Sequence, residues 1–366
     1  MKEPIELKSI VTERRLLKYP EVFGSLDRGC SLTKVLYVKP VPEKPEKVSL
    51  EMAVYANSDF EHVLDWLVAR ATEEGVIKTA GRKLRVTGVG GEKFKNEIAA
   101  TTCMGIEFVD EIMSHQTGGH FLLNNYEDDV FCYADGRTAE ESKPPVELPP
   151  WIAALQSRID EIFTSADGHR LPVIFGFCGS GTVINKLNED GTADMLGVHW
   201  FGGKSFLACR TCYWAQTTMM RSWSWLPEAK EMIDQDAKAE YRMLPGDFPM
   251  FPFGKSSEGA IPTGSFRRED VAAAVVGCIV SGLLTQVAAY CKLHRIRRVY
   301  LGGNFFRAKV ARDILRDCAE TVPTYRPLRF HFMSNGHTGC LGALQASAAD
   351  AAEMRAKLSS MKVDEK

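Results

Sequence analysis

The sequence predicts an α/β protein with two lobes, and three observations support this prediction. Segments with the apolar pattern of strands alternate with segments that have the spacing of helices. Glycine-containing turns lie beside predicted strands at four places, residues 27–31, 87–91, 178–182 and 298–307. Glycine at a strand end lets the backbone adopt a positive φ and approach a ligand closely. Because these turns are spread over 366 residues, enough for two cores, they predict a nucleotide cleft between two lobes.

The N-terminal elements are assigned from local pattern. Charged and mixed residues predict an arm over residues 1–22, followed by an N-terminal lobe over residues 23–135. The elements expected in this lobe are a strand at 32–38, a proline-rich loop at 40–47, a helix at 60–74, a strand at 84–88, a mostly helical segment at 93–115 and a short strand at 121–123.

A polar, proline-rich segment at 133–150 predicts the lobe boundary, with a linker at residues 136–150 and a C-terminal lobe at residues 151–366. The elements expected in the second lobe are a helix at 151–163, strands at 172–177 and 182–187, a turn entering a helix at 202–214, an irregular excursion at 222–268, a long helix at 271–291, a strand at 299–301 and an alanine-rich helix at 341–358.

The segment Val271–Cys291 carries no charge over its whole length, which is long enough to span a bilayer. Its glycine, serine, threonine and glutamine residues lower its hydropathy, and a strand follows it almost at once. We therefore predict a buried helix, packed between lobes or at a dimer interface, and no membrane span.

Composition excludes some classes of function. The formal net charge of −2 and the scattered basic residues give no basic field for nucleic acid. Several of the ten cysteines lie in apolar runs and the N-terminus is charged, which predicts reduced thiols in the cytoplasm. Cys209 and Cys212 have CxxC spacing, but no second ligand pair accompanies them, so a zinc site is not favoured.

Individual motifs leave alternatives open. Asp27, beside a glycine turn, could hold magnesium while the turn amides meet phosphate, or it could form an ordinary Asx turn. The segment Gly202–Ser205 resembles the end of a P-loop, but the first glycine of that motif is out of place by one residue, which favours a turn capping a helix. Glu111 lies on a predicted helix, where a solvated carboxylate is the simplest interpretation.

Seven segments taken together resemble the eukaryotic-type (type II) pantothenate kinases, which belong to the actin and hexokinase-like ATPase superfamily. The segment Asp27–Tyr37 (DRGCSLTKVLY) resembles D-I-G-G-T-L-V-K-L-V-Y in that family, and Thr87–Phe94 (TGVGGEKF) resembles T-G-G-G-A-x-K-F. The remaining matches are Val109–Met113 with Gly118 and Phe121–Leu123, Gly179–Val183 (GSGTV), Phe253–Lys255 (FGK), Gly303–Arg307 (GNFFR) and Gly336–Ala343 (GHTGCLGA). Their order is collinear with the family from about residue 23 to residue 348.

The resemblance implies a two-lobed actin/hexokinase-like fold with ribonuclease H-like lobes. It implies that Asp27 organises Mg²⁺ and phosphate and that Glu111 is the general base on the primary hydroxyl of pantothenate. It further implies an ATP cleft lined by the two Gly-containing loops and by the adenosine-side turn, through Gly29, Ser31, Gly88, Gly90, Gly179, Ser180, Gly181, Gly302, Gly303 and Asn304. Coenzyme A thioesters are further candidate ligands, and a homodimer or a heteromer with a related subunit is the expected assembly.

The departures from the family pattern are also specific. Arg28 and Cys30 replace an apolar residue and a glycine in the first loop, and Val183 stands where the family has a substrate-contacting serine. The arginine that the family aims at substrate falls on Met195, and Lys204 is the nearest cation in sequence that could replace it. Two hypotheses follow: an ATP-dependent pantothenate kinase of coenzyme A synthesis, or a catalytically weakened subunit with a regulatory or structural role. Another sugar or acyl-group kinase of the same fold is the third alternative.

Overall fold

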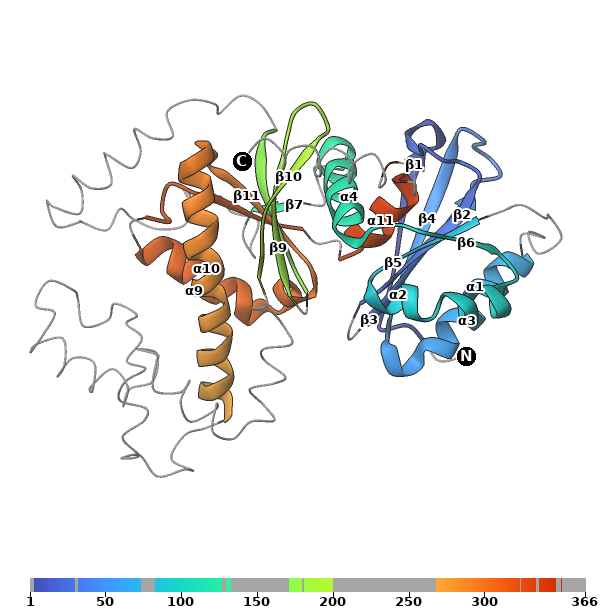
Figure 1. Ribbon diagram of the computed structural model, residues 1–366, viewed down its shortest axis with the longest axis horizontal. Coiled ribbons are helices and arrows are strands. Elements are labelled where there is room, and N and C mark those ends of the chain that lie inside the picture. The colour runs from blue at the N-terminus through green and yellow to red at the C-terminus, as the bar shows by residue number, and fades with distance from the viewer. Residues whose placement is uncertain are drawn as a thin grey trace, which may run out of the picture.

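The computed structural model describes residues 3–29, 32–73, 83–126, 130–132, 171–179, 181–199, 268–322, 324–333, 336–346 and 350. Two six-stranded sheets, each with its own helices, form two lobes (Figure 1). Four sequence predictions lie outside the described residues: the linker at 136–150, the helix at 151–163, the turn at 202–214 and all but the last residue of the excursion at 222–268.

The sheet of the first lobe has the strand order β1-β4-β3-β2-β5-β6. Strand β2 pairs antiparallel with β3 and parallel with β5, while β4 is antiparallel to β3 and β6 is parallel to β5. The strands are β1 (Glu6–Glu13), β2 (Val22–Arg28), β3 (Leu32–Pro40), β4 (Lys47–Ala56), β5 (Lys83–Thr87) and β6 (Gly105–Phe108).

The sheet of the second lobe repeats this arrangement, with the order β10-β9-β8-β11-β12-β7. Strand β8 pairs antiparallel with β9 and parallel with β11, β10 is antiparallel to β9, and β12 is parallel to β11. The strands are β7 (Val130–Cys132), β8 (Val173–Cys178), β9 (Thr182–Leu187), β10 (Ala193–His199), β11 (Arg298–Gly302) and β12 (Arg329–Met333). In both lobes three successive strands form an antiparallel meander, β2-β3-β4 in the first and β8-β9-β10 in the second. Two parallel strands, β5 and β6 or β11 and β12, extend the sheet on the side of β2 or β8. This duplicated topology is that of ribonuclease H-like lobes, so the predicted actin/hexokinase-like fold is confirmed.

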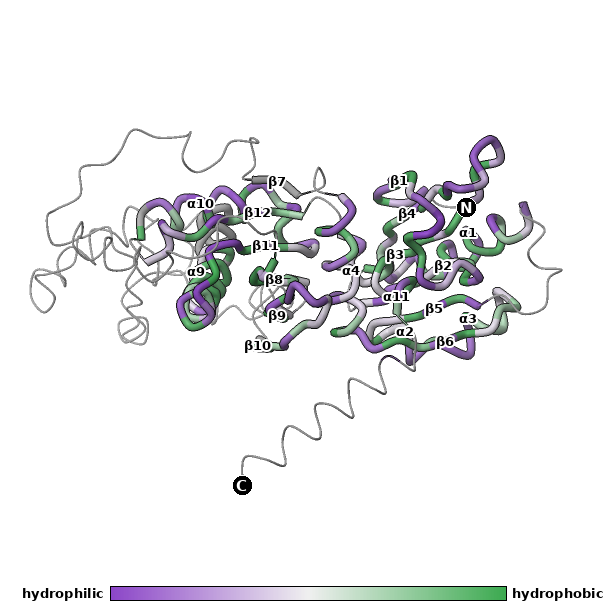
Figure 2. Tube along the Cα trace, turned by 90° about the horizontal axis from the view of Figure 1, so that it is seen from above, coloured by the Kyte–Doolittle hydropathy of each residue, from purple (hydrophilic) through white to green (hydrophobic). Residues whose placement is uncertain are grey.

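The helices and sheets form alternating layers (Figures 1 and 2). Helices α1 (Phe60–Glu73), α2 (Val89–Lys93) and α3 (Lys95–Thr102) belong to the outer side of the first sheet. Helices α4 (Glu111–Asn125) and α11 (Thr338–Gln345) lie between the two sheets, and α9 (Arg268–His294) and α10 (Lys309–Thr321) cover the far side of the second. The layers place the ends of α4 and α11 where the lobes meet.

The two central helices touch through glycine. A Cβ at Gly118 of α4 would overlap the backbone carbonyl of Thr338, and one at Gly342 of α11 would overlap that of Ser114. Each contact joins a glycine of one helix to the residue four positions before the glycine of the other, so the pair is symmetric. The absence of side chains therefore lets the helix backbones meet directly.

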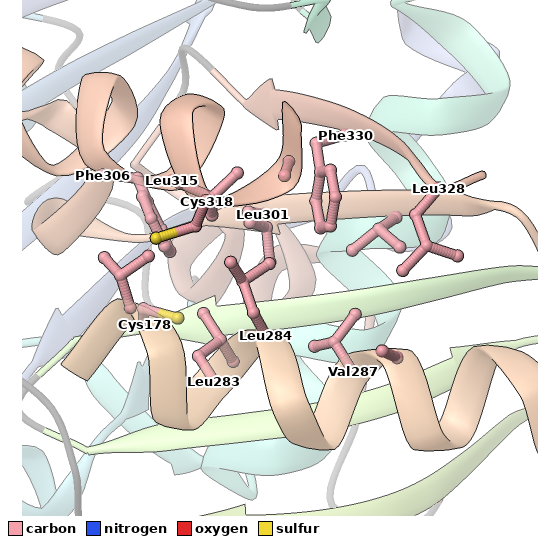
Figure 3. Close-up of a cluster of buried hydrophobic side chains, with 14 of the residues drawn as sticks. Cys178, Leu283, Leu284, Val287, Leu301, Phe306, Leu315, Cys318, Leu328 and Phe330 are labelled. Carbon is pink, nitrogen blue, oxygen red and sulfur yellow. The ribbon is translucent and has the colours of Figure 1, made fainter. Parts of the chain in front are cut away.

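Helix α9 packs one face inside the second lobe. Figure 3 shows Leu283, Leu284 and Val287 directed toward the strands and toward Leu315 and Cys318 of α10. By length and composition Val276–His294 is the one described helix that could cross a membrane, but buried core helices meet the same two criteria and 44% of its most apolar stretch is buried here. The predicted helix is thus confirmed, but α9 lies on the far side of the second sheet and not between the lobes, and its role in a dimer stays a prediction.

Four local predictions were wrong. The alanine-rich helix expected at 341–358 is interrupted, because α11 ends at Gln345 and Ala346 is extended. Residues 6–13 of the expected N-terminal arm form β1, which is paired with β4 along its whole length, because its backbone groups hydrogen-bond to that strand and extend the sheet. Residues 121–123 belong to α4, since the helix continues through their apolar run into the interlobe core. The segment 93–115 is interrupted by β6, a four-residue strand that exists because β5 offers it a partner.

Candidate active site

Asp27 and Lys34 form a buried ion pair at the hairpin of β2 and β3. They are register partners, and Lys34 Nζ lies 3.2 Å from Asp27 Oδ2. Asp27 is 3% exposed, so water screens this attraction little. Thr87, next to Asp27 in the parallel pairing of β2 with β5, has a buried hydroxyl without a hydrogen-bond partner among the described residues. Asp27 and Thr87 therefore lie at the carboxyl ends of the parallel strands β2 and β5, where α/β sheets bind ligands, and Lys34 lies beside them on β3.

Glu111 is the first residue of α4, and the helix start fixes its position. Asp110 caps the helix by accepting the Met113 N–H at 3.0 Å. Burial raises the pKa of Glu111 above its ordinary value, the negative charge of Asp27 raises it further, and a hydrogen bond from Val89 N–H opposes both. The structure thus brings Glu111 and Asp27 into one electrostatic environment, and Glu111 is suited to hold a proton reversibly.

A buried histidine joins the two lobes at this site. The His115 ring stacks on Phe177 with 3.5 Å between ring centroids, and its Nδ1 lies 3.0 Å from Thr338 Oγ1. Burial lowers the pKa of His115 to about 4, so the ring is neutral at physiological pH. The start of α11 reaches the same place, because a Cβ at Gly339 would lie 2.5 Å from Asp27 Oδ2. Sequence reasoning missed His115, Lys34 and Thr87; the two family motifs that contain Lys34 and Thr87 were the available signals.

The predicted glycine turns occupy matching places in the two lobes. Gly88 follows β5 with φ +84°, and Gly303 follows β11 with φ +97°. In both, a Cβ would collide with a backbone carbonyl at the end of the adjacent strand, that of Arg28 in β2 for Gly88 and that of Cys178 in β8 for Gly303. Both positions therefore require glycine for the backbone conformation and for the close approach.

The loops of the β2–β3 and β8–β9 hairpins contain the other predicted glycines. Gly29 N–H donates to the Leu32 carbonyl at 3.1 Å, and Gly179 N–H donates to the Gly181 carbonyl at 2.8 Å. Asp27 and Phe177 each stand two residues before the glycine of their loop. Two side chains connect them: His115 stacks on Phe177 and is influenced by the charge of Asp27, and Lys34 Nζ lies 5.2 Å from the Phe177 ring centroid. The structure thus brings the two predicted loops toward one interlobe site, although their binding of ligand stays a prediction.

The other predicted residues are distributed around this centre. Gly90 lies in α2 over Arg28, Gly302 ends β11, and Asn304 begins the following 3-10 turn with its Oδ1 buried and without a hydrogen-bond partner among the described residues. Val183 is half-buried on β9, and Met195 is 49% exposed on β10. Ser31, Ser180 and Lys204 lie outside the described residues, so the structure does not place the proposed replacement cation.

Arg28, which replaces an apolar residue of the family pattern, does not add charge to the phosphate side of the loop. Successive side chains of a strand point to opposite faces, so Arg28 turns away from the face that carries Asp27. Its guanidinium carbon lies 3.7 Å from the ring centroid of Phe60 and 3.6 Å from that of Phe94.

The side chains present fit a nucleotide with magnesium in their chemistry. Mg²⁺ prefers oxygen ligands and is commonly held by one or two carboxylates together with substrate phosphates, which Asp27 and the orphaned Thr87 hydroxyl could supply. The backbone N–H groups of the glycine turns are the usual partners of phosphate oxygens. In the described part of the chain no group of three or more His, Cys, Asp or Glu residues could hold a metal ion alone, so the phosphates would have to complete the coordination.

Comparisons with solved structures give low similarity over most of the chain. The activator of 2-hydroxyisocaproyl-CoA dehydratase from Clostridium difficile, with bound ADPNP, is 14% identical with a TM-score of 0.43, covering 92% of this chain and 97% of that chain. The ROK family glucokinase from Streptomyces griseus, in complex with glucose and AMPPNP, is 11% identical with a TM-score of 0.40, covering 90% of this chain and 99% of that chain.

Sequence comparisons are more informative. A 4'-phosphopantetheine phosphatase of Mus musculus is 22% identical over 364 residues, which cover 88% of this chain. The chain spans 40% of that relative's own length. Residues 24–348 match the family described as Fumble, and this range includes both glycine loops, Glu111 and the central helices. The chain therefore belongs to the Fumble family, which includes pantothenate kinase-like proteins.

Proposed function

We propose that this protein is a pantothenate kinase-like phosphotransferase, which moves the terminal phosphoryl group of ATP to the primary hydroxyl of pantothenate. The observation that carries the proposal is the convergence of Asp27, Lys34 and Glu111 on one buried interlobe site. Phosphoryl transfer needs positioning and charge neutralisation more than covalent chemistry from the protein, and this set of side chains offers both.

Each residue has a separate task in this reaction. Glu111 accepts the hydroxyl proton as the new bond to phosphorus forms and the bond to the ADP oxygen breaks. Its raised pKa brings it closer to neutral pH, where proton acceptance by a general base is most effective. Asp27 holds magnesium, which neutralises phosphate charge, and Lys34 is positioned to shift from Asp27 toward a phosphate oxygen. Lys34 thereby supplies a positive charge that Met195 cannot.

A second function is favoured by a specific observation. The register partners Phe177 and Val183 are apolar, and Met195 stands where the family has an arginine, so the second lobe offers few polar contacts to a substrate. A catalytically weakened subunit, which binds nucleotide and acts through a related partner chain, would retain the first lobe's site and lose these contacts.

The deciding experiment is an ATP and pantothenate turnover assay on the purified protein, alone and mixed with a co-purifying homologue. A kinase shows turnover that Glu111→Ala lowers by about 10²–10⁴-fold. A weakened subunit shows none alone, and Met195→Arg with Val183→Ser partly restores it. Robust turnover that survives Glu111→Ala contradicts both versions, since the base would then be another residue.

Calorimetry tests the nucleotide site independently of turnover. ATP binding should strengthen when magnesium is added, and Asp27→Ala should remove that increase. Tight, magnesium-dependent binding that is indifferent to Asp27→Ala would place the phosphates elsewhere.

A further inference from the structure

We propose that Glu6 is a positioning residue for the nucleotide site, because it holds the adenosine-side turn of the second lobe through an ion pair with Arg307. This turn is the 3-10 helix η6, Asn304–Arg307. The inference rests on the proposed function, in which ATP binds between the lobes. Glu6 belongs to β1, which lies outside the residues 24–348 that match the family, so the contact comes from a strand that the family pattern does not include.

The ion pair joins elements of different lobes. Glu6 Oε2 contacts Arg307 Nη1, and Glu6 Oε1 lies 3.2 Å from Lys8 Nζ. The Glu6 side chain is 13% exposed and that of Arg307 is 37% exposed, so the pair is partly shielded from water and salt. Because Glu6 is on the first sheet and Arg307 follows β11 of the second, their attraction draws the two lobes together.

The register of the first sheet fixes the direction of Glu6. Glu6 is opposite Val54 of β4, which is opposite Lys34 of β3, which in turn is opposite Asp27 of β2. Opposite residues of paired strands share a face, and Met52, two residues before Val54 on that face, belongs to the core between the lobes. With strands about 4.8 Å apart, the row from Glu6 to Asp27 measures on the order of 14 Å. Glu6 therefore faces the second lobe but lies too far from Asp27 to share a ligand atom with it.

The turn that Arg307 ends is a neighbour of the Asp27 site. A Cβ at Gly336 would lie 3.3 Å from Asn304 Oδ1 and 3.9 Å from Arg307 Cδ, so side chains from both ends of the turn pack against the segment that leads into α11. Three residues further along this segment, a Cβ at Gly339 would lie 2.5 Å from Asp27 Oδ2. One short segment therefore touches both the adenosine-side turn and the carboxylate expected to hold magnesium.

Asn304 is the group that this anchor presents to a nucleotide. Its Oδ1 is buried and has no hydrogen-bond partner among the described residues, and a buried acceptor without a partner is costly. An adenine amino group or a ribose hydroxyl could supply the missing donor. Because Asn304 and Arg307 are the two ends of one four-residue turn, fixing Arg307 against the first lobe also fixes the acceptor before ligand arrives, which favours binding.

Lys8 makes the ion pair reversible. If the lobes separate, Arg307 is already partly exposed and can be hydrated, while Glu6 keeps Lys8 and is not left as an unpaired carboxylate. A partly exposed ion pair changes an equilibrium constant by about fivefold at most. The contact is thus strong enough to favour closure and weak enough to permit opening.

The test uses Glu6→Gln in the full chain, with Glu13→Gln as the matched control. Glu13 is on the same strand, and its ion pair with Lys47, at 3.8 Å, stays within the first lobe. The first readout is amide hydrogen exchange over residues 304–307 in protein without nucleotide. We expect Glu6→Gln to accelerate this exchange about fivefold, because local opening of the turn becomes easier. Glu13→Gln should leave it unchanged.

The second readout is the Kd for ATP, measured by calorimetry. Removing a carboxylate near an anionic ligand should, by charge alone, strengthen binding. We expect Glu6→Gln instead to weaken it about fivefold, and this sign identifies lost positioning. The difference from wild type should shrink in about 1 M salt, where the Debye length is only about 3 Å. In an Arg307→Gln background, where the ion pair is already absent, Glu6→Gln should weaken binding no further.

Any of four results would overturn the proposal: unchanged exchange over residues 304–307 in Glu6→Gln, ATP binding that is unchanged or tighter in that variant, an equal effect of Glu13→Gln, or full additivity with Arg307→Gln. If ATP does not bind the wild-type protein at all, the proposed function fails, but exchange over residues 304–307 still decides whether Glu6 holds the turn.

Discussion

The hairpin of β2 and β3 in the first lobe and the hairpin of β8 and β9 in the second occupy equivalent places but carry opposite chemistry. In the first lobe the register partners are Asp27 and Lys34, a buried ion pair, whereas in the second lobe they are Phe177 and Val183. Glu111 stands three residues after β6, and the corresponding residue after β12 is Gly336. The scaffold is duplicated, but the charged groups are concentrated in one copy.

The comparison separates what the fold needs from what the chemistry needs. Both lobes keep a positive-φ glycine, after β5 in the first and after β11 in the second, because in both a carbonyl from the adjacent strand, β2 or β8, leaves no room for a side chain. The charged pair and the helix-start carboxylate occur once, and Phe177 and His115 form the apolar wall against which they lie. One lobe therefore supplies charge, and the other supplies a surface that excludes water and strengthens electrostatic interactions.

The largest effect should come from breaking the charged hairpin. Asp27→Ala leaves the Lys34 ammonium buried without its partner, which should cost about 3–5 kcal/mol in the free energy of unfolding and abolish phosphoryl transfer. The double variant Asp27→Leu with Lys34→Met, which gives the hairpin the apolar character of the second lobe, should recover most of the stability and none of the activity. Denaturant unfolding and the turnover assay measure both. Equal stability of the single and double variants would show that the pair is well solvated.

The glycine turns should respond alike in the two lobes. Gly88→Ala and Gly303→Ala should each destabilise by more than about 3 kcal/mol, because backbone strain and overlap with a carbonyl add together. Gly191→Ala is the matched control: φ there is +82° and nothing lies within 4 Å of the added Cβ, so backbone strain alone should cost about 1–2 kcal/mol. If all three variants lose the same stability, the close approach is not what selects glycine.

The ionised Glu111 carboxylate at the start of α4 should lower the free energy of unfolding at neutral pH. Its pKa is raised in the folded protein, so the native state binds the proton more tightly than the unfolded state, and stability falls as pH rises from the ordinary value of 4.5 through the raised value. Glu111→Gln should therefore increase Tm at neutral pH, and the gain should disappear below about pH 4. A gain that persists in acid would have another cause. The second lobe has no carboxylate at this place to titrate.

The smallest effect should come from the exposed face of α9, the long helix that precedes β11 in the second lobe as α1 precedes β5 in the first. Thr285, Ala289 and Leu293 form an exposed, uncharged stripe, with Leu293 73% exposed. If this face joins two chains as predicted, sedimentation should show a dimer, and Ala289→Arg should weaken it while changing Tm by only a few degrees. A monomer at all concentrations would limit the role of α9 to the core of its own lobe.

Local signals explain which parts of the fold were predictable. Glycine turns, the hairpin of β8 and β9 and the long helix are determined by residues close in sequence, so pattern alone indicated them. Strand β6 has four residues and β1 has an exposed outer face, and each depends on a neighbouring strand for its backbone hydrogen bonds. Residues 121–123 have a strand-like apolar run, but their packing in the interlobe core keeps them in α4.

The sequence by itself determined the α/β class, the glycine positions and, through the family pattern, the choice of Asp27 and Glu111. These follow from backbone sterics and from motifs whose residues are contiguous. Only the tertiary structure decided that Lys34 neutralises Asp27, that His115 is buried neutral against Phe177, and that Arg28 turns away from the phosphates. Each of these depends on which face of a strand or helix meets which partner, and the partners are not neighbours in the chain. The contacts of Lys34 and Arg28 form as the first lobe packs, and the contact of His115 with Phe177 forms only when the two lobes come together.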